Sequence, residues 1–159
     1  MKPFLLSIIT LAFLSACSGS NQNVAKETVT LEVYKSPTCG CCGQWVSHIK
    51  SEGFVVKTHN RQSLDSIKQQ FNIPTNLQSC HTGVSKDGYF FEGHIPAKFI
   101  HQFLAQPPAG ARGLTVPGMP VGSPGMEMGN RFTSYPILLV MEDGSTQVFA
   151  KIGSKEEQY

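Results

Sequence analysis

Three cysteines within four residues, Cys39-Gly40-Cys41-Cys42, are the feature that most constrains how this chain can fold. The residues before them, 29–34, alternate apolar with polar side chains, which is typical of a strand. The apolar residues after them recur at i, i+3, i+4 and i+7, as on one face of a helix: Cys42, Trp45, Val46 and Ile49. The thiols therefore lie where a strand leads into a helix that ends near Gly53. At a helix N-terminus the dipole and free N–H groups favour thiolate over thiol.

The rest of the chain is predicted to alternate between strands and helices. Strands are expected at 54–57, 80–85, 89–92, 136–141 and 146–152, and helices at 64–71 and from Pro96 onward. Asp-Gly pairs at 87–88 and 143–144 predict hairpin turns. Five prolines and six glycines between Pro107 and Asn130 predict a long loop without regular structure. The expected fold is α/β, in a thioredoxin-like arrangement with a Gly/Pro/Met-rich loop inserted before the final β-hairpin.

The N-terminal residues are expected to direct export. Lys2 precedes an apolar run at 4–14 that is too short to span a bilayer, as in a signal peptide. The following Leu14-Ser15-Ala16-Cys17 resembles a bacterial lipoprotein signal, in which Cys17 would be lipidated; the alternative is ordinary cleavage near Ala16. The predicted divisions are a signal peptide at 1–16, a tether at 17–27, a domain at 28–153 and a polar tail at 154–159. We expect a periplasmic protein, anchored to the outer membrane by its lipid alone.

The charge balance argues against a nucleic-acid partner. The chain has 13 Lys and Arg against 11 Asp and Glu, a formal net charge of +2. So small a net charge provides no broad basic surface for phosphates.

Export exposes the four remaining cysteines to an oxidising compartment that favours disulfides. The plausible pairs are Cys39 with Cys42, or one member of the cluster with Cys80, because adjacent Cys41 and Cys42 would form a strained ring. A Cys-x-x-Cys frame is all that a thioredoxin-type oxidoreductase requires, with Cys39 attacking and Cys42 resolving. Cys41 adds a third soft donor that such chemistry does not need. The cluster therefore favours metal binding, with Cys80 as a fourth ligand.

The other soft donors indicate which metal. Met119, Met126 and Met128 lie in the predicted loop, and thioethers with thiolates favour Cu(I), whereas zinc seldom takes methionine. Each methionine could equally fill a gap in the packing. His81, which adjoins Cys80, and His94 are candidates for further ligands or for groups that orient them. The other three histidines are assigned to the surface or to helix faces: His48, His59 and His101.

Four motifs in one order resemble the CopG-type copper-resistance family, formerly a domain of unknown function. They are Cys39-Gly40-Cys41-Cys42, Ser79-Cys80-His81-Thr82, Gly93-His94-Ile95-Pro96-Ala97, and the loop sequence VPGMPxGSPGME at 116–127. The resemblance covers residues 29–152 and implies a thioredoxin-like fold.

The resemblance also implies a periplasmic copper protein whose ligands are Cys39, Cys41, Cys42 and Cys80. Nearby methionine and histidine side chains would complete the site, and four thiolates allow a cluster of several Cu(I) ions. A redox role, interconverting Cu(I) and Cu(II), is attached to the family as well, and the implied partners are copper ions and other periplasmic copper-handling proteins. The alternatives are an exported thiol-disulfide oxidoreductase that uses Cys39 and Cys42, and a passive zinc site.

Overall fold

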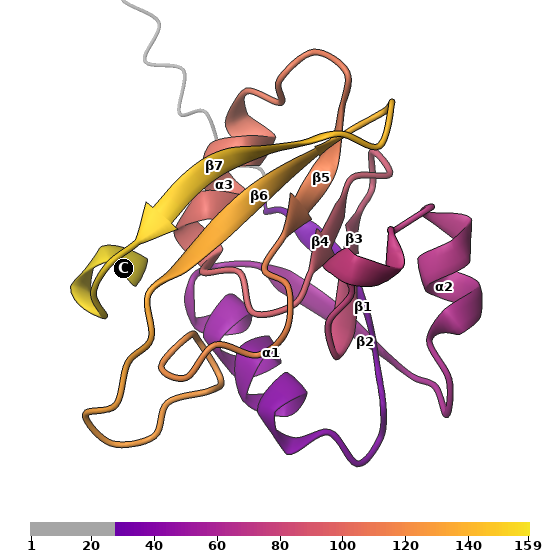
Figure 1. The fold of residues 1–159 in the computed structure, drawn as a ribbon. Coiled ribbons are helices and arrows are strands. Elements are labelled where there is room, and N and C mark those ends of the chain that lie inside the picture. Colours follow the sequence, from indigo (N-terminus) through magenta and orange to yellow (C-terminus); the bar gives the residue numbers. More distant parts are fainter. Residues whose placement is uncertain (1–27) are drawn as a thin grey trace, which may run out of the picture.

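The computed structural model describes residues 28–159 (Figure 1). The signal peptide, the tether and the lipidation site Cys17 that the sequence predicts lie outside the described residues. A seven-stranded sheet in the order β2-β1-β3-β4-β5-β6-β7 organises the domain. Within the described part of the chain, every helix is too short or too polar to cross a membrane.

The first half of the sheet is built from a parallel crossover. β1 (Thr30–Lys35) leads through α1 (Gly40–Ser51) to β2 (Val55–Asn60), which pairs parallel with β1. The alternating apolar residues of β1, Leu31 and Val33, are fully buried, and Trp45 and Ile49 of α1 pack in the same core. The strand and the helix that flank the cysteine cluster are therefore confirmed.

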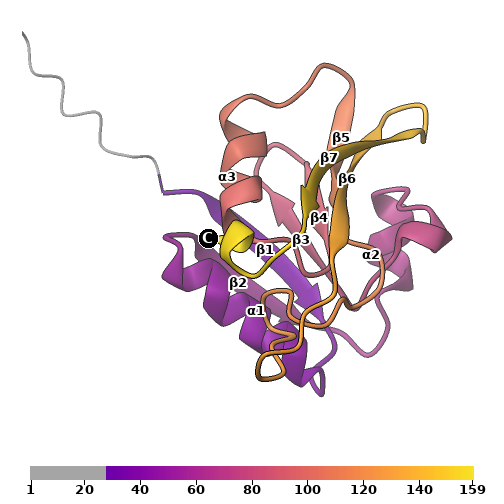
Figure 2. The ribbon, with the colours of Figure 1, turned by 60° about the vertical axis from the view of Figure 1, so that its left-hand side comes forward.

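The next elements also follow the predicted order. They are α2 (Asp65–Gln70), the 3-10 helix η1 (Thr75–Leu77), β3 (His81–Ser85), β4 (Phe90–Glu92) and α3 (Ala97–Ala105). Gly88 has a φ of 83° in the turn between β3 and β4, which is why the Asp-Gly pair suits that hairpin. Figure 2 shows α1 and α3 on one face of the sheet and α2 on the other. A second, smaller core under η1 contains Phe90 and Val140.

The prediction of an irregular loop throughout 107–130 is wrong for β5 (Ala111–Thr115). This strand pairs parallel with β4 and antiparallel with β6 (Tyr135–Met141), which in turn pairs with β7 (Thr146–Ile152). It joins the two halves of the molecule into one sheet. Gly113, counted above as a loop residue, is needed because a Cβ there would lie 2.0 Å from the Phe90 carbonyl oxygen. Here strand pairing overrides a local composition that predicts a loop.

The mixed α/β class is confirmed, and the thioredoxin-like assignment stays a prediction. The irregular segment begins after β5 and extends to Ser134, so a Gly/Pro/Met-rich loop does precede the final hairpin. The residues after β7 include the 3-10 helix η2 (Glu156–Gln158). Gln158 is buried there, accepts a hydrogen bond from the Tyr135 hydroxyl at 2.8 Å and donates one to the Gly122 carbonyl at 3.0 Å. The C-terminal residues thus hold the loop against the sheet.

The close contact between β4 and β5 can be tested at Gly113, in the strand that the composition did not predict. Gly113→Ala should lower the free energy of unfolding by about 1 to 3 kcal/mol, because the added methyl group must displace the β4 backbone. Gly43→Ala in α1 is the matched control, since a Cβ there meets nothing within 4 Å. It should be neutral or stabilise the domain by up to about 1 kcal/mol. Urea unfolding measures both, and equal stabilities would contradict the close β4–β5 pairing.

Candidate metal centre

Four cysteines from two parts of the chain meet beside the N-terminus of α1. The Sγ atoms of Cys39, Cys41, Cys42 and Cys80 all lie within 4.8 Å of one another. Cys39 caps α1, and its sulfur accepts the Cys42 N–H at 3.3 Å. Cys80 comes from the link of residues 78–80 between η1 and β3. The structure thus brings together the four residues expected to be ligands.

Two of these cysteines are joined in a disulfide, Cys39–Cys42, one of the pairings that the sequence left open. Cys41 and Cys80 are the free thiols among the described residues, and both are partly buried. The Cys41 sulfur lies 3.4 Å from that of Cys39. In this oxidised form only two of the four sulfurs are thiols, so binding a metal through all four requires reduction.

The Cys80 thiol is protonated at neutral pH. Burial, followed by the nearby Cys41, raises its pKa to about 11, while a hydrogen bond from Ser79 opposes the shift. A metal that binds Cys80 must therefore displace a proton from it.

Two imidazoles face Cys80. His81 Nδ1 lies 3.3 Å from its sulfur and His94 Nε2 lies 3.2 Å from it. His94 Nδ1 is 2.9 Å from the Pro124 carbonyl oxygen, which can only accept a hydrogen bond, so Nδ1 carries the proton. In neutral His94 the Nε2 lone pair then points at Cys80. That orientation suits either accepting the thiol proton or binding a metal.

Burial keeps both histidines neutral. It lowers the pKa of His94, and it lowers the pKa of His81 well below the ordinary value, with His94 and Lys68 adding to the effect. His81 is fully buried against the ring of Trp45, with ring centroids 4.3 Å apart, and its Nε2 has no hydrogen-bond partner among the described residues. Cys80, His81 and His94 form a second group of donors close enough to share a metal.

The loop between β5 and β6 approaches this centre through its backbone. Pro124 orients His94, and Gly125 packs so closely on α1 that a Cβ would lie 2.7 Å from both the Cys41 carbonyl oxygen and the Trp45 nitrogen. Figure 1 shows this segment passing beside α1. The Gly118 carbonyl accepts the Ser79 hydroxyl at 2.5 Å. The loop is thus fixed to the elements that carry the cysteines.

The methionines are placed less favourably for metal binding than the cysteines. Met119 and Met128 are 53% and 50% exposed, and Met126 is half-buried. Their proposed contact with a metal therefore remains a prediction.

The three other histidines have partners away from the cluster: His48 accepts the Ala97 N–H, His59 pairs with Glu32, and His101 contacts the Glu52 carbonyl.

Sequence reasoning missed a buried ion pair next to Cys80. Lys68 of α2 and Glu92 at the end of β4 are 7% and 0% exposed at their side chains and contact each other directly. Burial raises the pKa of Glu92, against the opposing effect of Lys68. One signal was available, because Glu92 follows two phenylalanines in a buried strand. Nothing in the local sequence pattern predicts that Lys68, in a separate helix, is its partner.

These features define the class as an α/β protein with a cysteine and histidine cluster that can hold a metal. A family model described as "Protein of unknown function, DUF411" matches residues 77–126. Curated protein sequences give no match.

Two solved structures resemble the chain over most of its length. "Copper resistance protein copG- Form 1" is 40% identical, with 79% of this chain and 98% of that one covered and a TM-score of 0.74. "Copper resistance protein copG- Form 2" is 39% identical, with 79% and 99% covered and a TM-score of 0.75. The chain belongs to the CopG family of copper resistance proteins.

The close approach of the loop to α1 can be tested at Gly125. Gly125→Ala should push the loop away from α1 and accelerate modification of Cys41 by N-ethylmaleimide, measured by mass spectrometry of the oxidised protein. Gly129→Ala is the matched control, since Gly129 also has a positive φ, 59° against 85°, but a Cβ there meets nothing within 4 Å. Equal rates for the two variants would contradict a role for crowding at Gly125.

Proposed function

We propose that this protein binds Cu(I) through Cys39, Cys41, Cys42 and Cys80 and acts in copper resistance. The observation that carries the proposal is the meeting of four sulfur atoms within 4.8 Å of one another. Thiolates are soft ligands and prefer Cu(I) to harder ions. The two related structures are named copper resistance proteins, which supports copper as the metal.

Capture of Cu(I) begins with reduction of the disulfide. A dithiol reductant transfers two electrons and two protons to Cys39–Cys42, becomes a disulfide itself, and leaves four thiols in the cluster. Each thiol that binds Cu(I) then releases its proton, so the affinity for copper falls as the pH is lowered. The N-terminus of α1 offsets part of the negative charge that accumulates on the sulfurs.

His94 and His81 extend this site. The lone pair of His94 Nε2 can take the Cys80 proton or bind copper directly, and His81 is the second imidazole within reach of Cys80. Four thiolates can bridge several Cu(I) ions, so the proposal includes a multinuclear site. Met119, Met126 and Met128 act as outer thioethers that pass copper in or out.

The proposed setting is the periplasm, with the chain attached to the outer membrane through lipid on Cys17. There the protein exchanges copper with other periplasmic copper-handling proteins and interconverts Cu(I) and Cu(II), with a one-electron carrier of that compartment accepting or donating the electron. The oxidising environment explains why the cluster has a disulfide form.

An anaerobic Cu(I) titration against a competing chelator tests the binding site. The reduced protein should bind more than one Cu(I) per chain tightly, whereas the Cys39–Cys42 disulfide form should lose most of this capacity. Cys39→Ser should reduce both the stoichiometry and the affinity. Cys17→Ser is the control, because that residue is assigned to the lipid anchor, and it should leave binding unchanged. Failure of the reduced protein to compete for Cu(I) would overturn the copper-binding proposal.

The Cys39–Cys42 disulfide favours one further candidate function, a thiol-disulfide oxidoreductase. Cys41→Ser separates the two functions. If the protein is a copper protein, the variant should bind less Cu(I); if it is an oxidoreductase, turnover of the disulfide with a reductant and a protein disulfide substrate should largely survive. Wild-type turnover together with unchanged copper stoichiometry in Cys41→Ser would favour the oxidoreductase.

A further inference from the structure

Cys80 lies in a segment without regular structure, so its position needs an explanation. The other three cysteines are held by the first turn of α1, whereas Cys80 ends the link of residues 78–80 between η1 and β3. Cys80 is the cysteine that brings a second part of the chain into the proposed copper site. Its placement therefore decides whether four sulfurs or only three converge.

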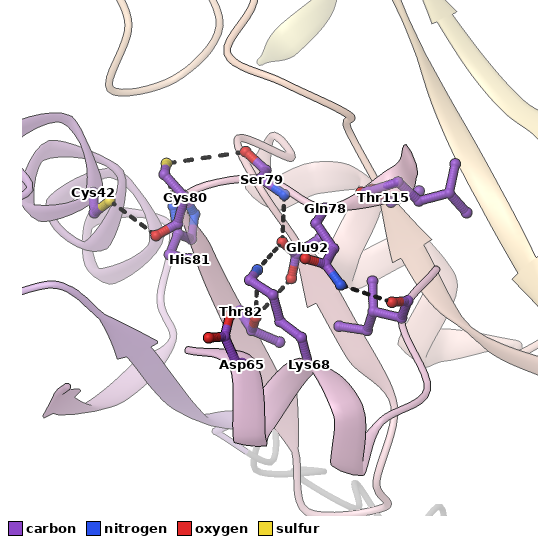
Figure 3. A network of polar contacts seen from close by, with 12 residues as sticks. Cys42, Asp65, Lys68, Gln78, Ser79, Cys80, His81, Thr82, Glu92 and Thr115 are labelled. Atoms are coloured by element: carbon purple, nitrogen blue, oxygen red, sulfur yellow. Dashed lines mark hydrogen bonds and ion pairs between the residues drawn. The ribbon is translucent and has the colours of Figure 1, made fainter. Parts of the chain in front are cut away.

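The link is held by a carboxylate. Ser79 N–H donates to Glu92 Oε1 at 2.6 Å, directly before Cys80 in the chain. Figure 3 shows Ser79 between Cys80 and Glu92, with the Ser79 side chain toward the Cys80 sulfur and the Ser79 nitrogen toward the Glu92 carboxylate. The bond is part-buried, and a backbone N–H that is shielded from water costs free energy when it loses its partner, so this contact restrains the link.

Glu92 is itself fixed from two sides. Thr82 Oγ1 donates to Glu92 Oε2 at 2.6 Å, and the Lys68 ammonium contacts Oε1. Lys68 Nζ also lies 3.4 Å from Thr82 Oγ1. The carboxylate thus receives donors from α2, β3 and the link. A fully buried carboxylate needs such a counter-charge, and Lys68 supplies it.

Glu92 is also followed closely in the chain by His94, whose imidazole faces the Cys80 sulfur. Gly93 follows it with a φ of 80°, and a Cβ on Gly93 would lie 2.8 Å from the Ser79 hydroxyl oxygen. His94 comes next, with Nε2 at 3.2 Å from the Cys80 sulfur. Glu92 therefore holds the Cys80 segment by its side chain and lies two residues before the imidazole that faces the Cys80 sulfur.

We propose that Glu92, neutralised by Lys68, is the positioning residue that holds the Cys80 thiol against the α1 cysteines and His94. Among the described residues Glu92 makes no hydrogen bond to a cysteine sulfur, and it acts through the Ser79 N–H. The effect of Glu92 on copper affinity rests on the proposed copper site. Its effect on the position of Cys80 does not.

Two double variants differ only in whether residue 92 keeps an oxygen that can accept the Ser79 N–H. Lys68→Leu/Glu92→Leu removes both charges together, so no uncompensated charge stays buried, and it leaves Ser79 N–H without an acceptor. Lys68→Leu/Glu92→Gln removes the same charges and keeps an oxygen for Ser79. Thr115→Val is the matched control, because the buried Thr115 hydroxyl donates to the Leu77 carbonyl at 2.7 Å and steadies the same region without Glu92.

The first readout needs no copper. In a full-length Cys17→Ser/Cys41→Ser background with the Cys39–Cys42 disulfide formed, Cys80 is the remaining thiol of the five cysteines. Its reaction with N-ethylmaleimide should be severalfold faster in the Leu/Leu variant and close to wild type in the Leu/Gln variant and in Thr115→Val. Equal rates in the two double variants, both folded by circular dichroism, would overturn the proposal.

If the Leu/Leu variant does not fold, Thr82→Val, which removes one donor to Glu92, provides a second test. It should accelerate the reaction more than Thr115→Val does, and an equal rate would overturn the proposal.

The second readout is Cu(I) affinity of the reduced protein with Cys41 present. We expect a loss of about 10- to 100-fold in the Leu/Leu variant, the usual effect of removing a group that orients a ligand, and recovery in the Leu/Gln variant. Unchanged affinity in Leu/Leu would show that positioning of Cys80 has no consequence for copper and would overturn that part of the inference. Absence of Cu(I) binding by wild type would instead defeat the proposed function, while the maleimide rates would still decide the role of Glu92.

Discussion

The antiparallel pairing of β1 with β3 is the constraint on which the candidate site depends. Its register places Lys35, at the end of β1, opposite His81, at the start of β3. The chain leaves β1 toward Cys39 and enters β3 from Cys80, so one pair of strand ends brings together cysteines that are far apart in sequence. A shift of the register by one residue would turn the β3 side chains to the other face of the sheet and separate His81 from Trp45.

The polar interior beside Cys80 follows from this arrangement. The link that carries Cys80 is not part of a ladder, so its backbone groups need partners from elsewhere. Glu92 accepts the Ser79 N–H, and Lys68 compensates the buried charge that results; the Gly118 carbonyl accepts the Ser79 side-chain hydroxyl. A carboxylate and an ammonium in the core do little for stability on their own. Their value here is that they fix one segment with respect to another, which an apolar contact would do with less directional precision.

Local patterns predict those parts of this protein that depend on neighbours in sequence. The cysteines at the start of α1 and the Asp-Gly turn at Gly88 follow from periodicity and turn chemistry, and both are present. β5 was missed because Gly113 is required by its partner strand, and a partner cannot be identified from composition. The Lys68–Glu92 pair was missed for the same reason. The family's motifs predicted which cysteines converge, and the local Cys39–Cys42 disulfide was one of two pairings left open, but the approach of Cys80 to the other three depends on tertiary pairing.

The two candidate functions are linked because they use the same sulfur atoms. Cys39 and Cys42 form a disulfide or offer thiolates to a metal, and they cannot do both at once. A metal that binds the dithiol form alone stabilises it by mass action and draws the equilibrium away from the disulfide. Copper would thereby make Cys39–Cys42 easier to reduce, and a stronger oxidant would favour release of copper. In the proposed periplasmic setting, redox poise and copper supply together would set how much of the protein is loaded.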